Sequence, residues 1–312
     1  MHMNNIELRI YGLMRSGNHA IINWIQAQYT DQSICFLNNV AHGDHDPFNS
    51  YRQIEIKGMN ESSGAKSLRG SRKQVLIYSY EDRANLEEPD RNEDFISSVF
   101  CQSFESNREK YLGSSRKRFD VCIIRDPFNC FASRLKLIRT KGPMGGASDM
   151  PSIVQNWKSL ARHAIELSSN PNNSQIVINY NRWVKSQIYR KELSSKLCGS
   201  FSDSSIDEIS QYGGGSSFDL PKLKLIDALA NFHKVFSMRR LKNFRAYLKR
   251  MSPQSPRKDN LFLRWKLFYH DPTFRKIFDD PELLNLSESL FGEIPGTRDF
   301  VSAILSDKFR QS

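Results

Sequence analysis

Cysteine is scarce in this sequence, which has five among its 312 residues, at positions 35, 101, 122, 130 and 198. Their number is odd, their spacing is wide, and no Cys-x-x-Cys pair or Cys/His cluster occurs. Neither a disulfide framework nor a zinc site is therefore indicated. Cys122 lies in an apolar run, which predicts a buried, reduced thiol. Thiols of this kind are typical of a reducing compartment.

Long apolar runs are also absent. None reaches the length that spans a bilayer, and residues 1–5 lack the basic-then-apolar order of a secretory signal. We therefore expect a cytoplasmic protein without a membrane partner. The 39% hydrophobic and 25% charged residues are ordinary globular proportions. The net charge of +11 favours an anionic ligand without choosing among nucleotide, nucleic acid and membrane surface.

Short apolar runs alternate with helical patterns along the first two thirds of the chain. The runs that read as strands are 6–11, 34–37, 75–80, 119–124 and 175–180. Helices are predicted over 20–25 and 152–167 and from Asp126-Pro127 onward, because proline is tolerated in a first helical turn. This alternation predicts an α/β, three-layer sandwich with a central, mainly parallel sheet.

The domain organisation follows from the same pattern. We expect one domain over 1–312, with an α/β core over about 5–200 and a mostly helical region over about 201–312. Two stretches lack a strand or helix pattern: 60–72 is rich in Ser, Gly, Lys and Arg, and 141–152 contains Gly142, Gly145 and Gly146. Each is predicted to be a loop, either a substrate lid or a surface loop without a role.

The first chemical motif is a loop bracketed by Gly12 and Gly17, between a predicted strand and a predicted helix. This spacing suits a phosphate loop that turns backbone N–H groups toward an anion at a helix N-terminus. In nucleotide triphosphatases such a loop continues with Lys and Ser/Thr, whereas here Asn18 and His19 follow. The Mg²⁺-binding hydroxyl is missing from its usual place, and the cation, Arg15, lies inside the loop.

The second motif begins with Arg125 at a strand end and places Ser133 eight residues later, within the next helix. A guanidinium and a hydroxyl placed in this way can bind one phosphate together. The alternative is an exposed arginine and an unrelated helix-surface serine.

Together the two motifs resemble those of the sulfotransferases that use 3'-phosphoadenosine 5'-phosphosulfate (PAPS). The resemblance implies a P-loop-like nucleotide site in which the first loop binds the 5'-phosphosulfate and Arg125 with Ser133 binds the 3'-phosphate. It also implies adenine contacts from Tyr180 and the segment Ser216-Ser217-Phe218, and a C-terminal basic element. The donor-binding residues implied are Arg15, Ser16, Gly17, Asn18, His19, Ala20, Arg125, Ser133, Tyr180, Ser216, Ser217, Phe218, Arg257 and Lys258, with Arg264 as an alternative cation.

Catalysis would then consist mainly of positioning and charge stabilisation, without a metal. Arg15 would neutralise the leaving phosphate, but an arginine is a poor proton donor. His19 could donate that proton, or it could simply bond a phosphate or a neighbouring carbonyl. For the general base we favour Glu81, with Asp82 second, because both follow the strand between the two motifs. Two loop histidines at positions 42 and 45 could also reach the acceptor side, but we favour the alternative that they are solvated loop residues.

The partner implied is a small-molecule acceptor with a hydroxyl or an amine, for instance in natural-product biosynthesis; a homodimer is left open. Two other functions compete with this one. The first is a P-loop nucleotide kinase or phosphotransferase, which would require Mg²⁺. The second is a polyanion binder without catalytic activity, suggested by the acid-free basic stretch 239–258. No recognised nucleic-acid module accompanies that stretch, so we expect no nucleic-acid partner.

Overall fold

The computed structural model describes residues 2–29, 32–40, 54–57, 72–82, 95–141, 149–170, 172–206 and 261–311. For 54–57, 141 and 307–311 only the backbone is considered. Several predicted features lie outside these ranges: most of both loops, the histidines at 42 and 45, the basic stretch 239–258, and the candidate residues Ser216, Ser217, Phe218, Arg257 and Lys258.

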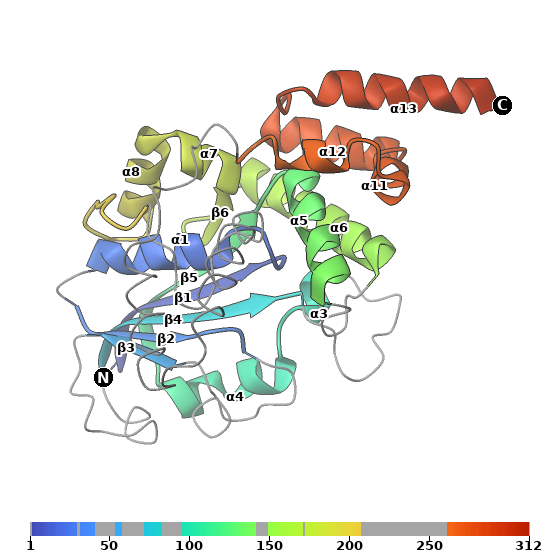
Figure 1. Ribbon diagram of the computed structural model, residues 1–312. Helices are drawn as coiled ribbons and strands as arrows, with labels where there is room; N and C mark the ends of the chain where they lie inside the picture. The colour runs from blue at the N-terminus through green and yellow to red at the C-terminus, as the bar shows by residue number, and fades with distance from the viewer. Residues whose placement is uncertain are drawn as a thin grey trace, which may run out of the picture.

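A six-stranded sheet forms the centre of the described fold (Figure 1), with the order β3-β2-β4-β1-β5-β6. The strands are β1 (Asn4–Gly12), β2 (Ile34–Leu37), β3 (Ile54–Lys57), β4 (Lys73–Glu81), β5 (Ser115–Ile124) and β6 (Gln175–Asn179). All pairings are parallel except that of β3 with β2. The mainly parallel sheet is confirmed, and its five parallel strands are those predicted.

Two details of the strands differ from the prediction. The four-residue edge strand β3 was not predicted, because so short a run carries too little periodicity to stand out. The prediction that the last strand extends to Tyr180 is wrong: Asn179 caps a helix that begins at Tyr180, its side chain accepting a hydrogen bond from the Arg182 N–H.

Helices cover both faces of the sheet. On one face lie α1 (Asn18–Gln26), η1 (Ala27–Tyr29), α7 (Tyr180–Lys185) and α8 (Gln187–Lys196). On the other lie α3 (Phe95–Ser98), α4 (Gln102–Leu112), α5 (Pro127–Lys141) and α6 (Met150–Ser169). The C-terminal elements pack against α5 and α6: η4 (Arg264–Phe268), α11 (Pro272–Ile277), α12 (Pro281–Phe291) and α13 (Thr297–Gln311).

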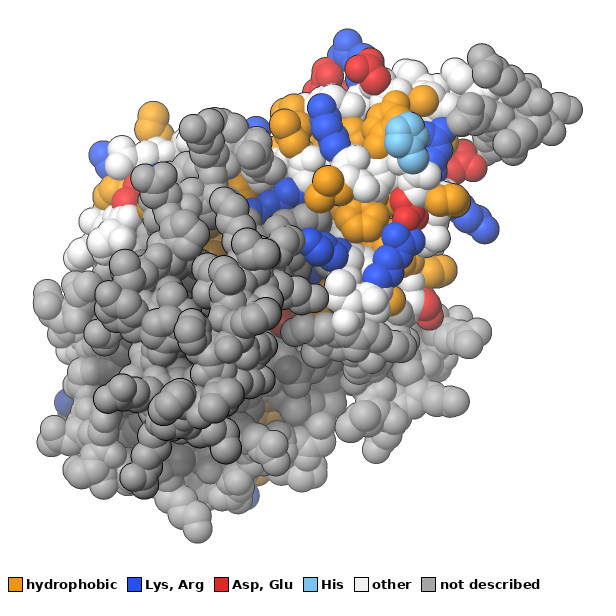
Figure 2. Space-filling view, in the orientation of Figure 1, with side chains coloured by type: hydrophobic (Ala, Val, Ile, Leu, Met, Phe, Trp, Pro, Cys, Tyr) orange, Lys and Arg blue, Asp and Glu red, His pale blue; other side chains and the backbone are white. Residues whose placement is uncertain are grey.

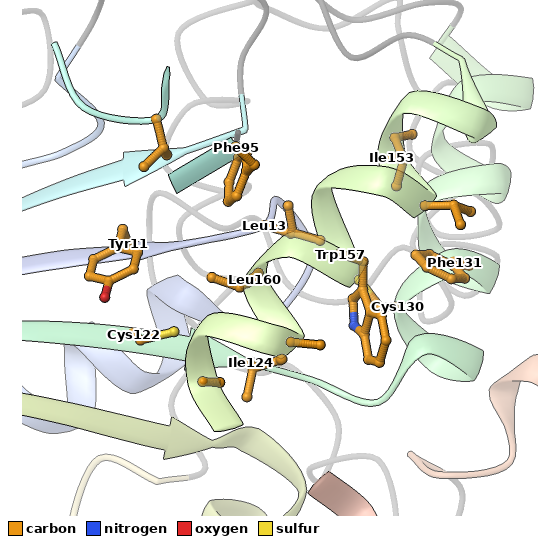
Figure 3. Close-up of a cluster of buried hydrophobic side chains, with 14 of the residues drawn as sticks. Tyr11, Leu13, Phe95, Cys122, Ile124, Cys130, Phe131, Ile153, Trp157 and Leu160 are labelled. Carbon is orange, nitrogen blue, oxygen red and sulfur yellow. The ribbon is translucent and has the colours of Figure 1, made fainter. Parts of the chain in front are cut away.

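The strands divide their side chains between two cores, because successive residues of a strand point to opposite faces. Ile10 and Val121 belong to the core under α1, whereas Tyr11 and Cys122 belong to the core under α6. Figure 3 shows the latter core, where Tyr11, Cys122 and Ile124 of the sheet, with Leu13 of the loop after β1, meet Phe131, Trp157 and Leu160 of the helices. The predicted three-layer arrangement is therefore confirmed.

Two smaller predictions are also tested by the described residues. All five cysteines are free, and all but Cys198 are buried, as predicted for Cys122. The predicted loop over 141–152 is too long at its C-terminal end. Residues 150–152 already belong to α6, because Asp149 accepts a hydrogen bond from the Ser152 N–H and caps that helix.

In the part of the chain that is described, no helix combines the length and apolarity needed to cross a bilayer.

Candidate active site

The loop between β1 and α1 is tightly bent. A Cβ atom at Gly12 would lie 2.6 Å from the carbonyl oxygen of Ile123, so only glycine lets β1 approach β5 there. Gly17 has a φ of +91°, and a Cβ atom on it would lie 2.2 Å from the Tyr180 ring. Arg15 also has a positive φ, of 75°. Residues with positive φ thus alternate with a residue of negative φ between them. This backbone geometry turns successive N–H groups to one side and forms a concave anion site.

Neighbouring side chains hold this loop in place. The Met14 N–H donates to the carboxylate of Asp82, which forms an ion pair of 2.8 Å with Arg134. The Nδ2 of Asn18 donates to the Leu13 carbonyl at 3.1 Å. Asp82 is only 2% exposed, and burial raises its pKa to about 6, although Arg134 opposes that shift. The loop is thus supported before any ligand binds.

The two sequence motifs meet at this loop. The Nε of Arg15 donates to the Oγ of Ser133 at 3.0 Å, although the two residues are 118 positions apart. The Nη1 of Arg125 donates to the carbonyl oxygen of Arg15, also at 3.0 Å. β1 and β5 are adjacent parallel strands, so their carboxyl ends deliver the loop and the second motif to the same edge of the sheet.

Positive charge is concentrated there. Burial and the charge of Arg125 lower the pKa of Arg15. Within the described residues neither arginine has a carboxylate within ion-pair distance, and the Nε of Arg125 is buried without a hydrogen-bond partner. Two closely spaced, partly desolvated cations of this kind need a counterion. The arrangement therefore fits an anionic ligand.

Tyr180 lies beside both parts of the site. Its ring packs on Gly17, and the guanidinium of Arg125 lies 4.9 Å from the ring centroid. The carbonyl of Arg125 accepts a hydrogen bond of 2.9 Å from Trp157. Tyr180 thus supports the loop and the second motif at their junction.

The other predicted donor-binding residues occupy different positions. The Ser16 side chain is buried against Cys130, so only its backbone can face a ligand. Ala20 lies half-buried in the first turn of α1, and Arg264 begins η4. That C-terminal segment is tied to the start of α5 by the Nδ2 of Asn129, which donates to the Phe262 carbonyl at 3.1 Å.

Glu81 and His19 lie together on the β4 side of the loop. The Oε1 of Glu81 accepts a hydrogen bond of 3.0 Å from the Nδ2 of Asn18 and lies 4.0 Å from the Nδ1 of His19. The Nε2 of His19 lies 3.1 Å from the Oδ1 of Asn38. Glu81 therefore borders the loop with its side chain 9% exposed, while its neighbour Asp82 is enclosed and paired.

Asn38 was not predicted from the sequence. The signal that could have found it is its place directly after β2, since polar residues at the carboxyl ends of parallel strands commonly line a ligand site. Among the described residues no group of three or more His, Cys, Asp or Glu side chains is arranged to hold a metal ion.

Comparison with known proteins gives similarity at the level of structure. No family model and no curated protein matches the chain. The solved structure of mouse sulfotransferase SULT7A1 complexed with PAP is similar, with 13% identity, a TM-score of 0.39, and coverage of 71% of this chain and 70% of that one. The sulfotransferase domain of the olefin synthase of Synechococcus PCC 7002 is similar at 10% identity and a TM-score of 0.44, covering 94% and 96%. The chain is similar to these two sulfotransferase structures, and this similarity assigns it no activity.

Proposed function

We propose that this protein is a PAPS-dependent sulfotransferase, which moves a sulfuryl group to a hydroxyl or amine of a small acceptor and releases 3'-phosphoadenosine 5'-phosphate (PAP). One observation carries the proposal: Arg15 and Arg125 converge with Ser133 at the phosphate loop and lack a carboxylate partner among the described residues. A donor with phosphate groups at both its 5' and 3' positions supplies two anions for two cations.

Each residue has a chemical role in this proposal. Backbone N–H groups of the loop and Arg15 bind the 5' end, where negative charge builds on the leaving phosphate. Arg125 and Ser133 bind the 3'-phosphate, and the Nε of Arg125 has no hydrogen-bond partner within the described residues. Ser133 accepts a hydrogen bond from Arg15, and its own hydroxyl proton remains available to a phosphate oxygen.

Glu81 is the proposed general base. Its Oε1 is held by Asn18, and no hydrogen bond to its Oε2 is present within the described part of the chain. That oxygen can take the proton of the acceptor as the acceptor attacks sulfur. Asp82 is less suited to the role, because it is enclosed and already engaged with Arg134 and the loop.

Calorimetry with PAP and with 5'-AMP, both in the presence of EDTA, tests the donor site. We expect PAP to bind at least about tenfold more tightly, since a charge-assisted contact to the 3'-phosphate contributes about 1.5–3 kcal/mol. Arg125→Ala should reduce this preference to about twofold or less. Arg162→Ala is the matched control, because that arginine is 53% exposed and paired with Glu282. Equal affinity of the wild type for both nucleotides would exclude a 3'-phosphate site.

Transfer itself is tested with donor labelled in its sulfuryl group and a panel of phenols, alcohols, sugars and amines. Glu81→Gln should lower the transfer rate by about 100-fold while PAP affinity stays unchanged. Full turnover in that variant would remove Glu81 as the base. A requirement for Mg²⁺ with ATP as the donor would favour the kinase alternative instead.

A further inference from the structure

A polar cluster at the carboxyl ends of β2 and β4 joins Asn38, His19 and Glu81. We infer that Asn38 and His19 form a positioning unit that fixes one imidazole tautomer and assists proton transfer through Glu81. The inference rests on the proposed sulfotransferase function and assigns His19 to the acceptor side of the site rather than to the leaving group.

The tautomer follows from the groups that surround the imidazole. An amide oxygen only accepts hydrogen bonds, so the Nε2 of His19, 3.1 Å from the Oδ1 of Asn38, must carry the hydrogen. The neutral ring then has its lone pair on Nδ1, the nitrogen that faces Glu81 at 4.0 Å.

The orientation of the Asn38 amide is supported by a second set of contacts. The Asn39 N–H donates to the Oγ of Ser79 at 2.8 Å, which leaves the hydroxyl proton of Ser79 for the Oδ1 of Asn38, 3.5 Å away. The Glu81 N–H donates to the Oδ1 of Asn39 at 3.3 Å. These contacts attach the turn after β2 to β4. They hold the Asn38 amide in place as the partner of the His19 imidazole.

The proton transfer balances as follows. The O–H bond of the acceptor breaks, its proton goes to Glu81 and its electron pair forms the new bond to sulfur. The bond between sulfur and the 5'-phosphate oxygen breaks, and that oxygen keeps the electron pair. The Nδ1 lone pair of His19 then accepts a hydrogen bond, or the proton itself, from the protonated Glu81. The oxygen now 4.0 Å from Nδ1 is Oε1, and rotation of the carboxyl group about its Cγ–Cδ bond brings the protonated Oε2 to this side. The contact then shortens to hydrogen-bond length, as catalytic contacts commonly do on binding.

Charges of both signs face Glu81. Arg15 of the loop and Asp82, next along the chain, each interact with it electrostatically.

The tautomer is tested on the full-length protein by long-range ¹H–¹⁵N spectroscopy of the imidazole rings, with His19 assigned through a His19→Gln variant. We expect the Nε2–H form in the neutral wild type. Asn38→Leu should abolish the tautomer preference, and Asn38→Asp should restore it. An Nδ1–H tautomer in the wild type, or an unchanged tautomer preference in Asn38→Leu, would overturn the inference.

A kinetic measurement needs no known acceptor if water serves as the nucleophile. Release of labelled sulfate from PAPS should fall about tenfold in His19→Gln and Asn38→Leu, with unchanged PAP affinity and an altered acid limb of the pH–rate profile. His270→Gln is the control, because His270 is exposed and contacts Tyr269. If the wild type fails to bind PAP, the proposed function fails. If it binds PAP and releases sulfate but neither variant changes the profile, only the role of His19 and Asn38 is wrong.

Discussion

At the scale of single residues, Asp82 is a buried carboxyl group with two polar partners. It accepts the Met14 N–H of the phosphate loop and pairs with Arg134, yet it is only 2% exposed. Burial raises its pKa from 3.8 to about 6, against the opposing effect of Arg134. Between these pH values the folded protein holds a proton that the unfolded chain has released.

The sign of the resulting pH dependence can be tested. The stability contributed by this proton is complete below about pH 4 and is lost as the pH rises through 6. The difference between the pKa of Asp82 in the unfolded chain and in the folded protein corresponds to about 3 kcal/mol of stability. We therefore expect the unfolding free energy of the wild type, relative to Asp82→Asn, to fall by about that amount between pH 4 and 7. Urea unfolding at several pH values measures this difference.

The control for this experiment is Glu293→Gln, which changes an exposed carboxyl group paired with Arg298. When Glu293→Gln is present in both proteins, the difference in unfolding free energy between wild type and Asp82→Asn should depend on pH in the same way. If the wild type instead gains stability over Asp82→Asn as the pH rises, the ion pair with Arg134 outweighs the desolvation of Asp82.

At the scale of elements, helix N-termini are secured by aspartates that also make tertiary contacts. Asp280 precedes α12 and accepts a hydrogen bond of 3.2 Å from the Leu283 N–H. The same carboxylate accepts from the Nζ of Lys158 on α6 at 2.8 Å. One side chain thus both starts α12 and attaches it to α6.

Substitution separates the two roles of Asp280. Asn caps a helix as well as Asp does, so Asp280→Asn should destabilise the protein by less than about 1 kcal/mol. Asp280→Ala loses the cap as well and should cost about 1–2 kcal/mol. Chemical denaturation of both variants measures the difference, with Glu282→Gln as the control for the charge on Lys158. Equal destabilisation by the two Asp280 variants would show that the ion pair, not the cap, holds α12.

At the scale of the whole molecule, the net charge of +11 raises the question of polyanion binding. In Figure 2 the Lys and Arg side chains over the C-terminal helices are interspersed with Asp and Glu. Ion pairs also join the C-terminal segment to the helices beneath it: Asp280 pairs with Lys158 of α6, and Asp271 pairs with Arg139 of α5. The described part of that face is therefore mixed in charge rather than a continuous basic surface.

Salt dependence distinguishes a nucleotide pocket from a polyanion surface. A DNA binder that makes six to ten phosphate contacts loses about 10³–10⁵ in affinity between 50 and 200 mM salt. We expect PAP affinity to fall by less than about tenfold over this range, since few phosphates are contacted. Arg125→Ala should weaken PAP at least about tenfold and change the affinity for a short DNA duplex by less than about twofold. Parallel losses for both ligands would favour the polyanion binder.

Local features of the sequence were enough to predict much of the fold. Five apolar runs identified the five parallel strands, because a strand covered on both faces must be apolar throughout its length. The spacing of Gly12 and Gly17 placed the loop, since close backbone approach and positive φ both require glycine there. The edge strand β3 was not predicted, because its formation depends on pairing with β2 rather than on an apolar pattern of its own.

The sequence by itself therefore determined the five parallel strands, the loop and the two motifs, all of which follow from neighbours in the chain. Only the tertiary structure decided how they meet. The pairing of adjacent strands β1 and β5 brings Arg15 to Ser133. The sequence ranked Glu81 before Asp82, but it did not show how their surroundings differ. Packing of α5 against the loop encloses Asp82 with Arg134 and leaves Glu81 beside His19. That choice depends on contacts between residues far apart in the chain, which no local pattern encodes.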